Sequence, residues 1–133
     1  RRSNVAKAAA LAAEIHVRHD RATQAQFVLE RALSLERAGP QAGLSMRLAL
    51  IVADSEPHAD ALQAVVYELI ARLSDQLQEL RRRSGPAPRS DPVERLSTAL
   101  AAARSVEGSR DPSRVKAALA PWRDPRAVAA LDP

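Results

Sequence analysis

Three residues close together in the chain have the spacing of a metal site. They are His16, His19 and Asp20. Two imidazoles three residues apart on a helix can share a metal ion, and a carboxylate is a suitable third ligand for zinc. The chain has no cysteine and no His-Glu-x-x-His pattern, either of which would favour a metal site. We therefore expect a polar helix end here, with no metal and no cofactor.

Other patterns typical of catalysis are also missing from the sequence. No serine lies in a Gly-x-Ser-x-Gly elbow, and the four glycines do not form a phosphate-binding loop. Acidic residues are scattered over faces that we expect to be polar, and His58 stands alone after Pro57. The sequence therefore predicts a protein that is not an enzyme and has no catalytic residues.

The densest basic run is Arg81-Arg82-Arg83, in a chain whose net charge is +4. Phosphate binding usually needs a longer basic face, with aromatic side chains where single strands stack. The three aromatic residues lie elsewhere, at positions 27, 67 and 122. Three arginines at a helix end are also explained by the negative end of the helix dipole. A nucleic-acid-binding regulator that uses these arginines is the alternative function.

The arginine run closes the strongest helical pattern of the chain, from about His58 to Arg83. Apolar residues recur there at intervals of three and four, which places them along one side of an α-helix. They are Leu62, Val66, Leu69, Leu73, Leu77 and Leu80, with Val65 and Ile70 beside them. No glycine or proline interrupts the pattern, and Gly85-Pro86 follow it. We expect one continuous helix of about 35–40 Å, against which shorter helices pack.

Three shorter helices are expected before it: from Ser3 or Asn4 to about His19, from Thr23 to Gly39-Pro40, and from about Gln41 to Asp54. The first has an apolar face formed by Val5, Ala8, Leu11, Ala12 and Ile15. Thr23 and Gln26 have the spacing of a capping box at the start of the second helix. These starts and stops predict a chain of antiparallel helices.

Residues 84–92 are expected to be a linker, because Ser84–Ser90 is rich in proline and polar residues. Beyond it, Asp-Pro occurs at positions 91, 111, 124 and 132. Asp is a good N-cap and Pro suits the first helical position, so the first three each predict a helix start. We expect a core domain at 1–83 and short helices at 93–133 that pack on it as one domain, with Trp122 buried as an anchor.

The segment Val5–Ala38 resembles the helical hairpin of tetratricopeptide repeats. Ala25, Leu29 and Ala32 have the small-large-small spacing of the second helix of the repeat, and Ala13 suits the small position of the first. The chain departs from the repeat in a histidine where tyrosine is usual, in a longer turn, and in the missing proline at the end. The resemblance implies a scaffold that binds peptides or partner proteins.

Together these patterns predict an all-α fold without a sheet: a helical bundle or a short tetratricopeptide-like α-solenoid built around the helix at about His58–Arg83. The expected function is protein–protein interaction, as a scaffold or adaptor module of a bacterial, cytoplasmic protein. Arginine and alanine are frequent and lysine is rare, as in proteins from GC-rich bacteria. No apolar run is long enough to span a bilayer. The chain begins with Arg1, as a fragment of a longer protein would.

We expect the partner, another protein or a second copy of this chain, to bind toward the end of the long helix. The first three helices are each about 20–25 Å long, too short to cover its whole apolar stripe. The predicted partner-binding residues are Tyr67, Ile70, Leu73, Leu77, Leu80, Arg81, Arg82 and Arg83. In the other outcome, which the sequence favours, the Asp-Pro helices fold back over Leu73–Leu80 and bury this part of the stripe, because exposed apolar patches of this size are uncommon on monomers.

Overall fold

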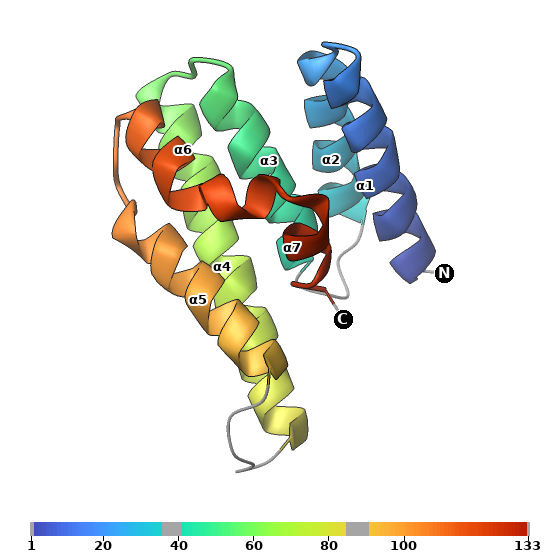
Figure 1. Ribbon diagram of the computed structural model, residues 1–133, viewed down its shortest axis with the longest axis vertical. Coiled ribbons are helices and arrows are strands. Elements are labelled where there is room, and N and C mark those ends of the chain that lie inside the picture. The colour runs from blue at the N-terminus through green and yellow to red at the C-terminus, as the bar shows by residue number, and fades with distance from the viewer. Residues whose placement is uncertain (1, 36–40, 85–90, 133) are drawn as a thin grey trace.

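The computed structural model describes residues 2–35, 41–84 and 91–132, and every regular element in these ranges is helical (Figure 1). The elements are α1 (Arg2–Arg18), α2 (Ala22–Leu35), α3 (Ala42–Asp54), α4 (Ala59–Ser84), α5 (Asp91–Ser105), α6 (Pro112–Leu119), the 3-10 helix η1 (Ala120–Arg123) and α7 (Pro125–Ala129). The prediction of an all-α helical bundle is confirmed. None of the described helices is both long and apolar enough to cross a membrane.

The long helix predicted at His58–Arg83 is α4, which continues without a break from Ala59 to Ser84. An aspartate in its first turn and three arginines in its last turn complement the helix dipole. The apolar stripe is buried along the helix, from Leu62 through Leu69 to Leu77. The expected stop at Gly39-Pro40 and the linker after Ser84 lie outside the described residues.

The most enclosed element is α3, rather than the longer α4. Ten of its thirteen residues are buried, and it contacts α1, α2, α4, α6, η1 and α7. One core cluster lies between α1, α2 and α3, and a larger one joins α3 to α4 and the helices that follow. A helix that is apolar on all sides can be enclosed in this way, so α3 connects the two parts of the core.

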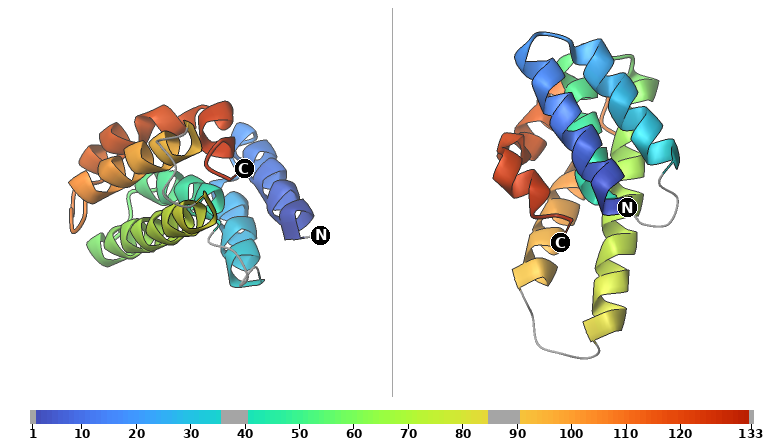
Figure 2. Two further views of the ribbon diagram at one scale, coloured as in Figure 1. Left: turned by 90° about the horizontal axis from the view of Figure 1, so that it is seen from below. Right: turned by 90° about the vertical axis from the view of Figure 1, so that its right-hand side faces the viewer.

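The helices from α1 to α5 run alternately up and down, and α6, η1 and α7 cross one face of the bundle (Figure 1). Seen from below, α1 and α2 lie at one end of the molecule, beyond α3 (Figure 2). As a result, α1 lies on one side of α3 and the C-terminal segment, residues 120–132, lies on another.

The apolar face expected on α1 is its exposed side. Ala9 and Ala13 are the residues that α1 buries, whereas Leu11 is 58% exposed and Ile15 40% exposed. Alanine on the inner face allows the helix backbone to lie close to its neighbours, and the larger side chains then point outward. Periodicity did not identify the buried side, because apolar residues occupy both sides of this helix.

Two of the Asp-Pro sequences start helices as predicted. Asp111 and Asp124 are the N-caps of α6 and α7, and each is followed by proline in the first turn. The Asp111 carboxylate accepts a hydrogen bond of 2.9 Å from the N–H of Ser113, and Asp124 accepts one of 2.9 Å from Arg126. These caps satisfy backbone donors that have no partner within the helix.

Two other expected helix starts differ from the structure. Asp91 was expected to be the N-cap that precedes α5, but it is the first residue of the helix itself. The capping box at Thr23 is wrong, because α2 begins at Ala22 and Thr23 lies inside its first turn. Gln26 donates instead to the Glu30 carboxylate, one turn further along the helix.

The C-terminal part of the chain folds back over the long helix. Leu96 and Leu100 of α5 share a core cluster with Leu73 and Leu77 of α4. These two leucines of α4 are 0% and 5% exposed, so they offer no free surface to a partner. The favoured outcome, in which the Asp-Pro helices cover the stripe, is therefore found at Leu73 and Leu77. Trp122 is also buried in this cluster, at 8% exposure, as expected.

Replacing Leu69 with alanine should lower the free energy of unfolding by about 2–5 kcal/mol, the range typical of a fully buried leucine. Its side chain is 0% exposed at the middle of α4. Urea unfolding followed by circular dichroism measures the change. Leu11→Ala is the matched control, because Leu11 is an exposed helical leucine and should change the value by less than about 0.5 kcal/mol. Equal effects of the two variants would contradict the assigned core.

Candidate partner-binding groove

The structure separates the residues that were predicted to bind a partner. Leu73 and Leu77 are in the core, and Ile70 and Leu80 are partly buried against it. The others are exposed: Tyr67, Arg81, Arg82 and Arg83. The end of α4 therefore does not present one continuous apolar surface.

The arginine run lies at the free end of α4 (Figure 1). Arg82 forms an ion pair with Glu79 one turn earlier, and Arg83 lies 3.9 Å from the same carboxylate. Part of the positive charge is thus neutralised within the helix itself. Nucleic-acid binding by these arginines stays a prediction, and of the run only Arg83 lines the groove described next.

A groove follows α3, between α1 on one side and the C-terminal segment on the other. It contains two hollows, of about 350 and about 280 Å³, whose linings share Arg47 of α3. The first hollow lies at the N-terminal end of α3, where Leu80 and Arg83 of α4 and Val128 of α7 also line it. The second lies at the C-terminal end of α3, beside Trp122. About half of the lining residues are aliphatic, and nearly all the others are charged or carry a side-chain amide.

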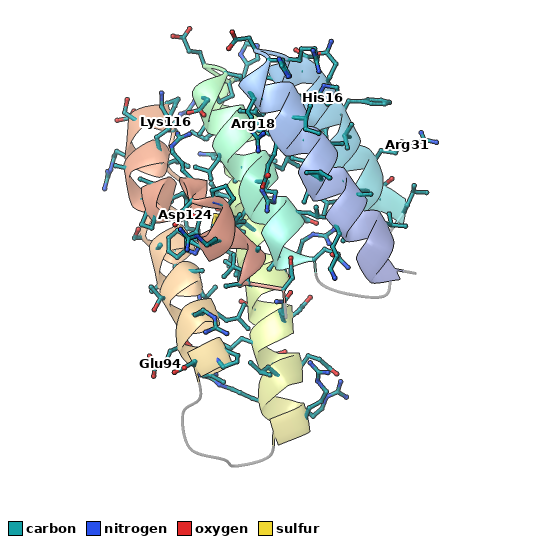
Figure 3. All side chains as sticks on the ribbon, turned by 45° about the vertical axis from the view of Figure 1, so that its right-hand side comes forward. His16, Arg18, Arg31, Glu94, Lys116 and Asp124 are labelled. Atoms are coloured by element: carbon teal, nitrogen blue, oxygen red, sulfur yellow. The ribbon has the colours of Figure 1, made fainter. Side chains whose placement is uncertain are left out.

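The groove exists because α1 has small side chains on its inner edge. Ala6 and Ala10 line the first hollow, and Ala13 and Val17 line the second. Side chains of this size do not reach across to the C-terminal segment. Figure 3 shows Arg18 on the side of α1 nearer α3, whereas Arg31 of α2 points away from the bundle.

An ion pair joins α1 to α3 where the two hollows meet, and its arginine lines both of them. Arg47 of α3 donates a 2.7 Å hydrogen bond to the carboxylate of Glu14 on α1, and the two side chains are only 14% and 24% exposed. A partly buried, charge-assisted hydrogen bond of this kind is stronger than one in open solvent. It fixes the distance between α1 and α3 and divides the groove.

The first turn of α3 is capped by residues from distant parts of the chain. Gln41, just before the helix, has a left-handed backbone with φ of 51° and gives no side-chain cap. The N–H of Ala42 donates to the side-chain oxygen of Gln76 at 3.3 Å, and the N–H of Gly43 donates to Asp132 at 2.8 Å. Gln76 also donates to the carbonyl of Leu131. The C-terminal segment is thereby fixed to the start of α3 and to α4.

Asp132 is a mostly enclosed carboxyl group at the edge of the first hollow. Burial raises its pKa above the usual range, although the Gly43 hydrogen bond, Gln76 and the charge of Arg47 oppose this effect. Gly43 permits the close approach, because a Cβ there would overlap the Asp132 carboxylate and lie 3.3 Å from the Val128 carbonyl oxygen. A side chain at position 43 would therefore require the Asp132 carboxylate to move.

The other end of α3 is also held by the C-terminal segment. Arg123 donates two hydrogen bonds, of 2.7 and 2.9 Å, to the carboxylate of Asp54, the last residue of α3. These bonds lower the pKa of Asp54 below its usual value and raise the pKa of Arg123. A carboxylate at the negative end of a helix dipole is unfavourable, and the guanidinium offsets this. Trp122 is thereby held at the second hollow.

The histidines near the end of α1 are in a different place and do not line the groove. Nδ1 of His16 accepts a 2.9 Å hydrogen bond from Nε of Arg21, across the turn in which Asp20 has a positive φ of 58°. Over residues 2–35, 41–84 and 91–132, no group of three or more His, Cys, Asp or Glu side chains is placed to hold a metal ion.

Of the predicted partner-binding residues, Leu80 and Arg83 line the groove, but the charged residues that organise it were not predicted. Arg47 and Asp132 were not singled out, because their partners, Glu14 and Gly43, are 33 and 89 residues away in the chain.

Comparisons with protein-family models, with curated proteins and with solved structures found no match for this chain. The resemblance to a tetratricopeptide hairpin stays a prediction. The four residues on which it is based, Ala13, Ala25, Leu29 and Ala32, are all buried.

Gly43→Ala should destabilise the protein by about 1–3 kcal/mol, because the added methyl group overlaps the Asp132 carboxylate. In an Asp132→Ala background, Gly43→Ala should lower the free energy of unfolding by a smaller amount, because the carboxylate that the methyl group would overlap is absent. The difference between the two costs should be at least about 0.5 kcal/mol, as for residues in direct contact. Urea titration of the four proteins measures it. Strictly additive effects would contradict the contact.

Asp54→Asn should lower the free energy of unfolding at neutral pH by up to about 1 kcal/mol, as expected for a pair that is partly exposed to solvent. The folded state lowers the pKa of Asp54, so its contribution is present above the unfolded pKa of about 4 and is lost as the pH falls through the folded value. Urea titrations between pH 7 and pH 3, followed by Trp122 fluorescence, should show the two proteins converging in acid. A constant difference would contradict the assignment.

Proposed function

We propose that this domain is a protein–protein interaction module, a scaffold or adaptor of a bacterial, cytoplasmic protein, and that the groove along α3 is its partner-binding site. The main supporting observation is the pair of adjacent hollows, about 350 and 280 Å³ in volume, in a surface groove that combines aliphatic and charged side chains. Grooves between helices, lined by apolar groups and a few placed charges, are typical binding sites for peptide segments.

The charged groups of the groove support binding rather than catalysis. Its four carboxylates are Glu14, Asp54, Glu79 and Asp132. The first three are in ion pairs with arginine, and Asp132 caps α3 through Gly43. These interactions hold the helices around the groove in place. A general acid or base must instead be able to reach a substrate proton.

The α1–α2 hairpin gives further support, because its resemblance to a tetratricopeptide hairpin implies partner binding. α1 packs mainly on α2, and reaches α3 through alanines and the Glu14–Arg47 ion pair. A segment bound in the groove would contact α1, α3 and the C-terminal segment together. It would thus bury apolar surface that this chain leaves open.

Val17→Asp should abolish binding of peptides selected from a displayed random 16-residue library, while Leu11→Asp should leave it unchanged. Val17 lines the second hollow, and a carboxylate placed there would have to be desolvated by the bound peptide. Leu11 is the matched control, since both residues are on α1 and about half exposed, at 48% and 58%. Binding is measured by biolayer interferometry with proteins of unchanged circular dichroism.

The opposite result would place the partner-binding site on another surface of α1. If Leu11→Asp removes binding and Val17→Asp does not, the partner uses the outer surface of α1, where Ile15 is also exposed. Peptides that bind both variants equally well would exclude α1 from the partner site.

A further inference from the structure

We propose that the segment bound in the groove is an acidic amphipathic α-helix that places two apolar side chains, seven residues apart, in the two hollows. This inference rests on the proposed function and specifies the partner. It is based on how the two hollows repeat along α1 and α3, and on which charges of the groove lack a partner.

The two hollows are related by a shift of seven residues on both helices. On α1, residues 6, 7 and 10 of the first hollow correspond to residues 13, 14 and 17 of the second, which residue 18 also lines. On α3, residues 43, 44 and 47 of the first correspond to residues 50, 51 and 54 of the second, and residue 47 lines both. Seven helical residues span about 10.5 Å. A third helix lying along the groove would repeat its side chains at the same interval.

Each hollow is large enough for a bulky apolar side chain. A cavity of about 150 Å³ already accommodates a benzene-sized group, and the hollows measure about 350 and 280 Å³. The Glu14–Arg47 ion pair lies where they meet. The helix must therefore carry small or polar residues between its two anchors, where it passes over the pair.

The groove is lined by five cations and four carboxylates. Glu14 pairs with Arg47, Asp54 with Arg123, and Glu79 with both Arg82 and Arg83. The fourth carboxylate, Asp132, accepts a hydrogen bond from the N–H of Gly43. Lys7 and Arg18 also line the groove, and neither forms an ion pair within the part of the chain that the structure describes.

These two cations lie at opposite ends of the groove edge of α1. Eleven residues separate Lys7 from Arg18, a distance of about 16 Å along the helix. Both are exposed, so they can meet carboxylates at the two ends of a bound helix. Complementary charges at the rim of an apolar site select and orient the partner.

The test uses a synthetic 18-residue peptide with leucines at positions 6 and 13, glutamates near both ends, and alanine or glutamine elsewhere. Trp122 is the only tryptophan of the chain and lines the second hollow, so its fluorescence reports binding directly. We expect a saturable change in emission. A peptide with leucines at positions 6 and 11, which lie on different sides of a helix, should bind at least tenfold more weakly.

Reversing the charges of Lys7 and Arg18 tests whether the bound helix is acidic. The double variant Lys7→Glu and Arg18→Glu should weaken binding of the glutamate peptide at least tenfold. A peptide with lysines in place of the glutamates should show the reverse preference. Because both residues are exposed on α1, circular dichroism should show an unchanged fold. Equal binding of both peptides by both proteins would overturn the acidic partner.

The outcome also separates this inference from the proposed function. If the library peptides need Val17 but carry neither acidic ends nor the seven-residue spacing, the acidic helix is wrong and the groove still binds a partner. If sedimentation shows a dimer that Val17→Asp dissociates, the occupant is a second copy of the chain and the inference is overturned. If the acidic peptide binds equally well to Val17→Asp, both proposals fail.

Discussion

A helix that is enclosed on all sides needs partners for its terminal backbone groups, and in this protein those partners come from far along the chain. The first N–H groups of any helix lack intrahelical acceptors, and the residue before α3, Gln41, does not supply one. Gln76 and Asp132 do so instead. Because α3 is the helix that both core clusters share, this cap connects the start of the central helix to α4 and to the last residues of the chain.

The same constraint explains the position of the C-terminal segment. Arg123 binds Asp54 at one end of α3, and Asp132 binds Gly43 at the other. The charges have the signs that suit the dipole of α3: a carboxylate at its positive end and a guanidinium at its negative end. Trp122, Val128 and Leu131 are buried between these two attachments. The segment is thus held along one side of α3 and cannot close over α1, so a groove is left between them.

The features of this fold that could be predicted from the sequence are those that depend on nearby residues. The spacing of leucines from Leu62 to Leu77 gave the extent of α4 to within one residue at each end, and Asp111 and Asp124 cap the helices that follow them. The groove depends on contacts between distant residues. The capping contact of Asp132 spans 89 residues, and no local pattern distinguishes a carboxylate that caps its own helix from one that caps another.

The difference between the leucine stripe of α4 and the groove beside α1 has a physical cause. The sequence left two outcomes for the end of the stripe, and in the structure α5 packs against its continuous row of large aliphatic side chains. In contrast, the edge of α1 that lines the groove includes three alanines, Ala6, Ala10 and Ala13. Large apolar side chains fill space and favour internal packing, whereas small ones beside a fixed neighbour leave space unfilled. In a bundle of this kind, the absence of side-chain volume next to a firmly held segment is therefore a better indication of a surface groove than an excess of apolar residues.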